Sequence, residues 1–240
     1  MHKNLYKTID KFKKIRIMKV NRKTGRGSSL KNVYSLMLED DVVAAIDRLA
    51  YLQNTNRSGL VNRILAEYAS VVTPEQRIRE AFSRITTLLD GQGSFRMATP
   101  SDTMLSLSSA LLYKYNPTVK YSVELYRTAE GGVGELRVSM RTQNRTLVAA
   151  LMRFYELWAG VEQAYLREVV FRAEDNKYAR RLFLREGGDP SCLGDAVAAY
   201  IRTFDTALKL YFSHMEDVRA AVREIERIYL AYLQGGGMIL

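Results

Sequence analysis

The sequence from Lys31 to Tyr68, KNVYSLMLEDDVVAAIDRLAYLQNTNRSGLVNRILAEY, contains a short folding unit. It opens with residues 34–38, in which apolar side chains alternate at the period of a β-strand. Acidic residues follow at 39–41, and carboxylates favour the positive N-terminal end of a helix. The stretch therefore predicts a strand that is followed directly by a helix.

Two helices are predicted after the strand. Apolar residues recur at helical spacing from Val42 to Ala50, and Asn54 suits the left-handed end of a helix. Asn56 or Ser58 can cap a second helix, whose apolar face comprises Val61, Ile64, Leu65 and Tyr68. Residues 31–68 thus predict a strand, a helix, a four-residue turn and a helix.

This order of elements resembles the ribbon-helix-helix family of DNA-binding proteins, the Arc, MetJ and CopG type, from Val33 to Tyr68. The resemblance implies that the strand pairs with the same strand of a second copy. A homodimer also follows from physical reasoning, because so small a unit buries little surface and its single strand leaves backbone groups unpaired. An ordinary strand followed by a helical hairpin is the alternative.

The resemblance also implies which strand residues meet DNA. The outward face would be Lys31, Val33, Ser35 and Met37, and in the family this face reads base edges in the major groove. The inward face, against the helices, would be Tyr34, Leu36 and Leu38. Only Lys31 and Ser35 can hydrogen-bond to bases, whereas Val33 and Met37 can contact thymine methyl groups. Having only two outward residues that can hydrogen-bond to bases is a departure from the family pattern. It leaves open the alternative that the unit only holds two subunits together.

A second DNA contact is expected at the start of the second helix. Asn56, Arg57 and Ser58 stand there, and Gly59 permits close approach. Free backbone N–H groups and the helix dipole at such a terminus attract phosphate, and Arg57 adds a positive charge. A plain helix cap is the structural interpretation, and the two are compatible.

The first thirty residues predict a basic, flexible arm. Residues 1–31 hold eleven Lys and Arg against one acid, Asp10, and the rest of the chain holds 25 basic and 25 acidic residues. The formal charge of +10 therefore resides in this segment, where Arg22, Lys23 and Arg26 are candidates for phosphate contacts. A solvated tail is the alternative. Met18, which begins the segment MKVNRKTGRGSSLK, is an alternative translation start to Met1.

The remainder, residues 73–234, predicts a mainly helical body with one β-hairpin near 120–141, followed by a flexible tail at 235–240. The helices are expected at 74–89, 99–115, 145–165, 174–186, 189–211 and 218–232. The predicted fold class is therefore mainly α. No family resemblance is found in the body.

Composition excludes several classes of function. No run of eighteen apolar residues predicts a membrane span, and the first thirty residues contain no secretory signal. The single cysteine, Cys192, fits a reducing cytoplasm, and with only His2 and His214 beside it no metal site is expected. No nucleophile elbow or other catalytic motif is present, so neither an enzyme nor a cofactor is predicted.

The sequence thus predicts a cytoplasmic, homodimeric, sequence-specific DNA-binding protein, with transcriptional repression as its use. Two alternatives remain open. One is a relaxosome accessory protein of a conjugative mobile element, and the other is an antitoxin; in both, residues 73–234 would bind a protein partner.

Overall fold

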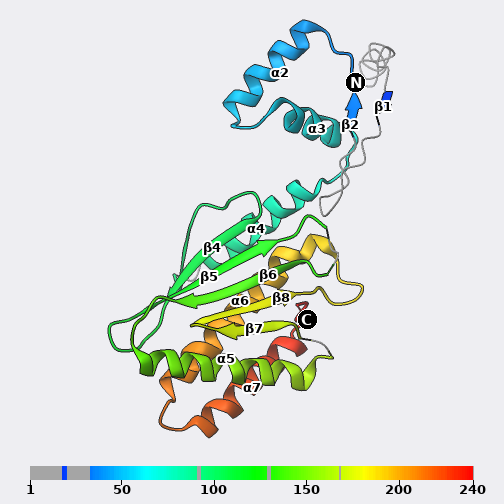
Figure 1. Ribbon diagram of the computed structural model, residues 1–240. Coiled ribbons are helices and arrows are strands. Elements are labelled where there is room, and N and C mark those ends of the chain that lie inside the picture. Colours follow the sequence, from blue (N-terminus) through cyan, green and yellow to red (C-terminus); the bar gives the residue numbers. More distant parts are fainter. Residues whose placement is uncertain (1–17, 21–32, 91–92, 129–130, 168, 240) are drawn as a thin grey trace. The chain divides into compact units, whose positions relative to one another are not determined.

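A computed structural model describes residues 18–20, 33–90, 93–128, 131–167 and 169–239 (Figure 1). The chain divides into two units at the bond between Thr73 and Pro74. We call Met1–Thr73 the head and Pro74–Leu240 the body.

The described residues of the head form two short strands and two helices: β1 (Met18–Val20), β2 (Val33–Ser35), α2 (Asp40–Leu52) and α3 (Arg57–Tyr68). Asp40 and Asp41 occupy the first turn of α2, where their carboxylates favour the helix dipole. Asn54 adopts a left-handed conformation, with φ of 50°, in the turn that leads to α3. Both helices of residues 33–68 lie where the sequence predicts them, whereas β2 covers only the first two residues of the alternating segment 34–38 and begins one residue earlier.

The body is built on a six-stranded antiparallel sheet of order β3-β4-β5-β6-β8-β7. Its strands are β3 (Phe95–Met97), β4 (Met104–Ala110), β5 (Thr118–Leu125), β6 (Gly134–Met140), β7 (Phe171–Glu174) and β8 (Lys177–Leu182). The helices are α4 (Pro74–Asp90), α5 (Arg145–Tyr165), α6 (Leu193–Ser213) and α7 (Val218–Gln234), and the 3-10 helix η2 (Pro190–Cys192) precedes α6.

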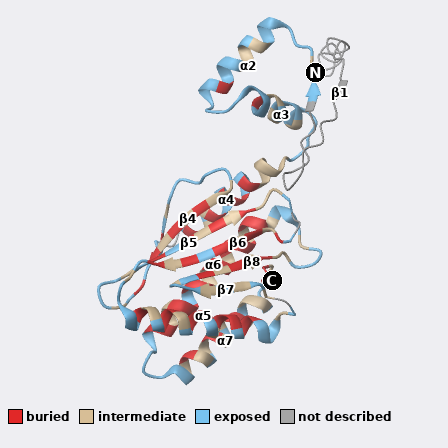
Figure 2. Ribbon diagram, viewed as in Figure 1, coloured by how far each residue is buried: buried red, intermediate tan, exposed pale blue. Residues whose placement is uncertain are grey.

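The sheet buries one face. Along β4, Leu105 and Leu107 are buried in the core while Ser106 and Ser108 on the other face remain partly exposed. The same alternation of buried and more exposed residues recurs along β5, β6 and β8, as Figure 2 shows. In Figure 1 the strands lie in front of α4 and α6, so the helices cover the buried face. Most side chains of the opposite face are polar and at least partly exposed, such as Ser106, Lys120 and Arg137.

The mainly α prediction was wrong, because two segments predicted as helices are strands. Residues 99–115 contain β4, and residues 174–186 contain most of the β7–β8 hairpin. Apolar residues at 104, 111 and 115 fit a helical period, but the buried residues Leu105 and Leu107 follow the period of a strand. The body therefore mixes helices with a large sheet. The helices at 74–89, 145–165, 189–211 and 218–232 and the hairpin near 120–141 were predicted correctly.

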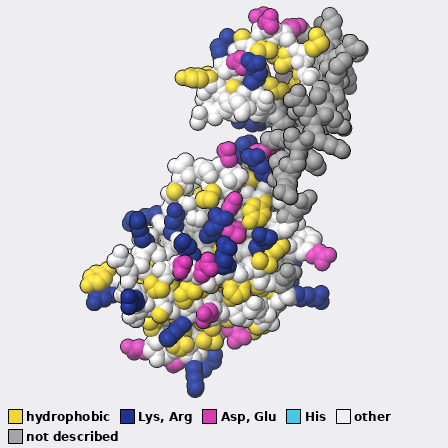
Figure 3. All heavy atoms as spheres, in the orientation of Figure 1, with side chains coloured by type: hydrophobic (Ala, Val, Ile, Leu, Met, Phe, Trp, Pro, Cys, Tyr) yellow, Lys and Arg dark blue, Asp and Glu magenta, His cyan; other side chains and the backbone are white. Residues whose placement is uncertain are grey.

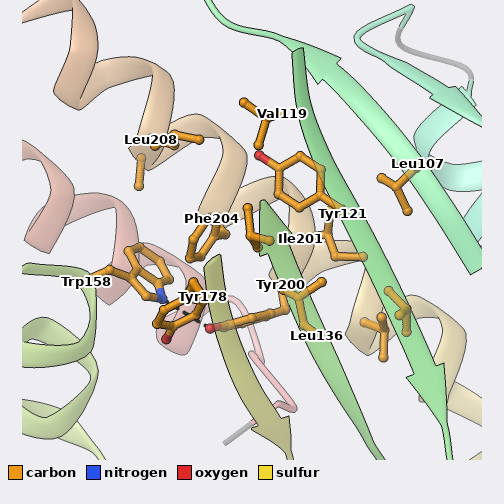
Figure 4. Close-up of a cluster of buried hydrophobic side chains, with 14 of the residues drawn as sticks. Leu107, Val119, Tyr121, Leu136, Trp158, Tyr178, Tyr200, Ile201, Phe204 and Leu208 are labelled. Atoms are coloured by element: carbon orange, nitrogen blue, oxygen red, sulfur yellow. Dashed lines mark hydrogen bonds between the residues drawn. The ribbon is translucent and has the colours of Figure 1, made fainter. Parts of the chain in front are cut away.

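Aromatic side chains fill the core between the sheet and its helices. Phe204 of α6 lies among Tyr121 of β5, Trp158 of α5 and Tyr178 of β8, with ring centroids 6.2, 5.3 and 5.4 Å away (Figure 4). Gly194 lets α6 approach α4 closely, since a Cβ there would lie 2.8 Å from the Ala81 carbonyl oxygen.

An ion pair is buried beside these rings. Arg180 Nε of β8 donates to Glu162 Oε2 of α5 at 2.9 Å, and neither side chain is exposed. The hydroxyls of Tyr178 and Tyr200 also donate to Glu162, at 3.3 and 3.0 Å. Trp158 Nε1 donates to Tyr200 at 3.1 Å, which ties the pair to the core. Burial raises the pKa of Glu162, and the charge of Arg180 and these hydrogen bonds offset only part of that effect.

The chain end differs from the flexible tail predicted for residues 235–240. Ile239 is fully buried, forms a β-bridge with Leu184 and exchanges hydrogen bonds with the Tyr232 hydroxyl. The glycine run at 235–237 thus serves a turn that returns the chain to the core. Among the described residues, no helix combines the length and apolar character needed to cross a membrane.

Candidate nucleic-acid interface

The candidate interface in the head centres on the start of α3. Asn56 caps this twelve-residue helix, and its Oδ1 accepts a hydrogen bond from the Gly59 amide at 2.8 Å. The amides of Arg57 and Ser58 are the other donors of the first turn, and both residues are exposed. The cap therefore orders a helix terminus that presents two donors to an anion.

Arg57 is held by a carboxylate from the preceding helix. Its Nε donates to Asp47 Oδ1 at 2.7 Å, and its Nη2 donates to Asp47 Oδ2, so the pair is bidentate. This hydrogen bonding lowers the pKa of Asp47. Side-chain exposures of 54% for Arg57 and 45% for Asp47 mean that water screens the pair, so a phosphate can compete for the guanidinium.

Gly59 has a local role in the same turn. A Cβ at this position would lie 3.1 Å from Thr55 Oγ1 and 3.2 Å from Asn56 Oδ1, against the capping atoms. The small residue therefore protects the cap geometry. A second contact between the helices, from Arg63 Nη2 to Gln53 Oε1, also ties α3 to the end of α2.

The strand residues are only partly as predicted. Ser35 ends β2 and is exposed, and Met37, just beyond it, is 75% exposed, as an outward face requires. Tyr34 and Leu38, expected against the helices, are nevertheless 52% and 39% exposed. Val33 begins β2, and Lys31 lies outside the described residues.

One edge of β2 is occupied by the same chain. β1 pairs with it antiparallel, with Lys19 opposite Tyr34. Pairing of β2 with the same strand of a second copy stays a prediction. Among the described strands no other pairs with β2. In the described part of the chain, the second edge of β2 thus has no paired strand.

The arm residues Arg22, Lys23 and Arg26 lie outside the described residues, so their part in the interface stays a prediction. The structure does bring Asn56, Arg57 and Ser58 together at one helix terminus.

No family model matches this sequence, and comparisons with curated proteins and with solved structures find no similar chain. Function must therefore be argued from the residues themselves.

The residues of the head whose burial is described, 34–73, contain few buried apolar side chains. Within residues 34–73 only Ala50 and Leu60 are buried apolar residues, whereas twelve large apolar side chains are at least 39% exposed (Figure 2). These are Tyr34, Met37, Leu38, Val42, Leu49, Tyr51, Leu52, Ile64, Leu65, Tyr68, Val71 and Val72. They come from the strand segment, from both helices and from the residues after α3. Exposed apolar surface of this extent is typical of an interaction site.

Sequence reasoning missed the role of Asp47. The residue stands ten positions before Arg57, on the exposed side of α2, and nothing in a single sequence distinguishes it from an ordinary solvated carboxylate. Only the antiparallel turn between α2 and α3 brings the two side chains together.

Proposed function

We propose that the protein binds duplex DNA through its head as a homodimer, recognises a sequence, and acts in the cytoplasm as a transcriptional repressor. The observation that carries the proposal is the exposed apolar surface of the head. A strand and two helices that bury two apolar residues cannot offset the conformational entropy of ordering them.

A second copy is the partner that this surface favours. The free edge of β2 can accept a strand, and the exposed residues of β2, α2 and α3 can be covered by the same residues of the other copy around a two-fold axis. Each apolar side chain covered in this way contributes about 25 cal/mol per Å² of buried area. Association would then supply the core that one head lacks.

DNA fits the polar features of the head. The α3 terminus, with the Arg57 and Ser58 amides and the Arg57 guanidinium, has the chemistry of a phosphate site. Ser35 is exposed and can hydrogen-bond to a base edge. Met37 can contact a thymine methyl group, so sequence discrimination rests on few polar contacts.

Assembly is tested first. Leu36→Asp places a carboxylate in the half-buried part of the strand segment and should convert a dimer into a monomer with an unfolded head, as measured by light scattering and circular dichroism. Leu112→Asp is the matched control, because Leu112 is 82% exposed in the body and its substitution should leave assembly unchanged. A monomeric natural protein with a folded head would contradict the proposed dimer.

Sequence recognition is tested by selecting binding sites from random duplexes. A short inverted repeat is expected, because the two-fold symmetry of a dimer is mirrored in its half-sites. Ser35→Ala should cost about 1–3 kcal/mol at one base pair of each half-site. Arg57→Ala should weaken all duplexes alike, since phosphate contacts position the protein without specifying sequence. Recovery of no enriched motif would refute sequence-specific binding.

A further inference from the structure

A row of basic and hydroxyl side chains crosses the uncovered face of the body's sheet. In register across β3, β4, β5, β6 and β8, the directly opposed residues are Arg96, Ser108, Lys120, Ser139 and Lys177. Residues directly opposite each other in an antiparallel sheet project from the same face. The row therefore alternates a cation and a hydroxyl over five adjacent strands.

The row lies on the accessible side of the sheet. The sequence neighbours of its members, such as Leu107, Val119 and Tyr178, are buried in the core under the helices. The three cations are exposed and the two serines are half-buried. Figure 3 shows Lys and Arg side chains over this face of the body.

One carboxylate lies next to the row, since Glu174 of β7 is directly opposite Lys177 in the register. Arg96, Lys120 and Lys177 form no ion pair with any described carboxylate. Further along the same face, Arg137 bridges two acidic residues, Glu124 at 2.8 Å and Glu135 at 2.6 Å. Arg172 and Arg181 also lie on this face. The row therefore joins three regularly spaced cations on a face that is basic beyond the row as well.

We propose that this row binds the phosphodiester backbone of a nucleic acid. Neighbouring strands lie about 4.8 Å apart, so the row extends for about 19 Å with a cation roughly every 10 Å. Each strand of a duplex carries one phosphate per roughly 3.4 Å of helix axis, so a row of this length spans about six base-pair steps, over which its three cations can contact phosphates of the backbone that faces the sheet. Serine hydroxyls between the cations can donate to the phosphate oxygens that remain.

The chemistry of the row favours this occupant over a lipid surface. A membrane-binding face combines cations with apolar side chains that enter the acyl boundary, and none of the five members of the row is apolar. Lys, Arg and Ser donors aimed at phosphates carry no sequence information, so the contact should be non-specific. It belongs to the body and does not depend on the function proposed for the head.

The test compares two full-length variants that lose the same charge. The first carries Arg96→Gln, Lys120→Gln and Lys177→Gln. The control carries Arg153→Gln, Arg219→Gln and Arg223→Gln, at exposed positions on α5 and α7. Anisotropy of a labelled mixed-sequence oligonucleotide, as duplex or single strand, is measured over a series of salt concentrations.

In the row variant, the logarithm of the binding constant should fall less steeply with the logarithm of the salt concentration. The magnitude of this slope should decrease by roughly 2.7 for a duplex or 2.1 for a single strand, which corresponds to three lost phosphate contacts. Whichever of the two probes shows this loss identifies the form of nucleic acid. The control should keep the natural slope. An unchanged slope in the row variant, or an equal decrease in the control, would overturn the proposal, as would row-dependent binding to phosphatidylserine vesicles without binding to nucleic acid.

The same measurement in a Leu36→Asp background separates the two proposals. There the difference between row variant and control should persist, whatever the outcome of binding-site selection with the intact head. Loss of the difference in that background would refute an independent contact by the body. Unfolding followed by the fluorescence of Trp158, the only tryptophan of the chain, confirms that each variant keeps the core intact.

Discussion

Replacing Arg180 by Met tests how the core of the body tolerates its buried ion pair. Arg180 donates hydrogen bonds from Nε to Glu162 and from Nη1 to the Arg181 carbonyl oxygen, each at 2.9 Å. Its guanidinium also lies 5.0 Å from the centre of the Tyr200 ring. Methionine fills most of the aliphatic volume but supplies none of these contacts. Glu162 would then be left fully buried without a cation.

The expected loss of stability at neutral pH is about 3–5 kcal/mol, the usual cost of removing one partner of a buried ion pair. For a unit of this size, each kcal/mol lowers the melting temperature by about 2–4 °C, so a decrease of roughly 6–20 °C is predicted. Fluorescence of Trp158 reports the transition directly, because Trp158 donates to Tyr200 beside the pair.

The loss should depend on pH in a defined direction. Burial already raises the pKa of Glu162 above its ordinary value of 4.5, and removal of Arg180 takes away the charge that opposes this rise. A raised carboxyl pKa favours the folded state most below pH 4.5, and this contribution disappears as the pH rises through the pKa of the folded state. The penalty of Arg180→Met should therefore shrink as the pH falls from 7 towards 4.5.

Two further variants make the reasoning refutable. Arg181→Met alters the next residue on the accessible face of β8 and should change stability by no more than about 0.5 kcal/mol. Adding Glu162→Gln to Arg180→Met removes the second charge and should recover much of the loss at neutral pH. A penalty that is independent of pH and unrelieved in the double variant would show that lost packing, rather than an uncompensated charge, explains the effect.

Three other predictions concern the head and its arm. Asn56→Ala removes the α3 cap and should lower the stability of the head by about 1 kcal/mol, measured by thermal unfolding at fixed protein concentration. Asp47→Asn should free Arg57 and increase the salt slope of DNA binding by roughly 0.9 for each phosphate gained, and an unchanged slope would contradict that. Deleting residues 1–26 should weaken binding to all duplexes and lower the slope by roughly 0.9 per lost contact; equal slopes with and without the arm would exclude its part in binding.

Helical periodicity identified those parts of the body in which one helix face is buried along its length. In α5, Leu151, Phe154 and Trp158 recur at the spacing of one helix face, and all three are buried. Helical periodicity gave the wrong element for β4. In so short a stretch, the alternating apolar residues and the following Leu111 fit the period of a helix as well as that of a strand. Asp175 and Asn176, with φ of 48° and 63°, form the two-residue turn of the β7–β8 hairpin, and this was a readable signal that the helix prediction overlooked.

The candidate sites also differ in whether their contacts are local in the sequence. The cap at Asn56 is local, since its partner is three residues away, and it was predictable from residue type. The ion pair of Arg57 with Asp47 depends on the angle between two helices, and the row on the sheet depends on the register of five strands. No single-sequence pattern contains either of these, because both are set by pairing between segments that are distant in the chain.

The different cores of the two units imply different dependence on concentration. The body buries a continuous set of aromatic and aliphatic side chains and can be stable as one copy, whereas the head buries only Ala50 and Leu60 among its described residues. The proposed association would complete the core of the head, so its folding and its dimerisation would become one equilibrium, and anything that binds the dimer would stabilise the fold. DNA that engages both α3 termini would then drive assembly by mass action. At low concentration the chain would keep a folded body, and the contact proposed for its sheet would remain while the head is not yet formed.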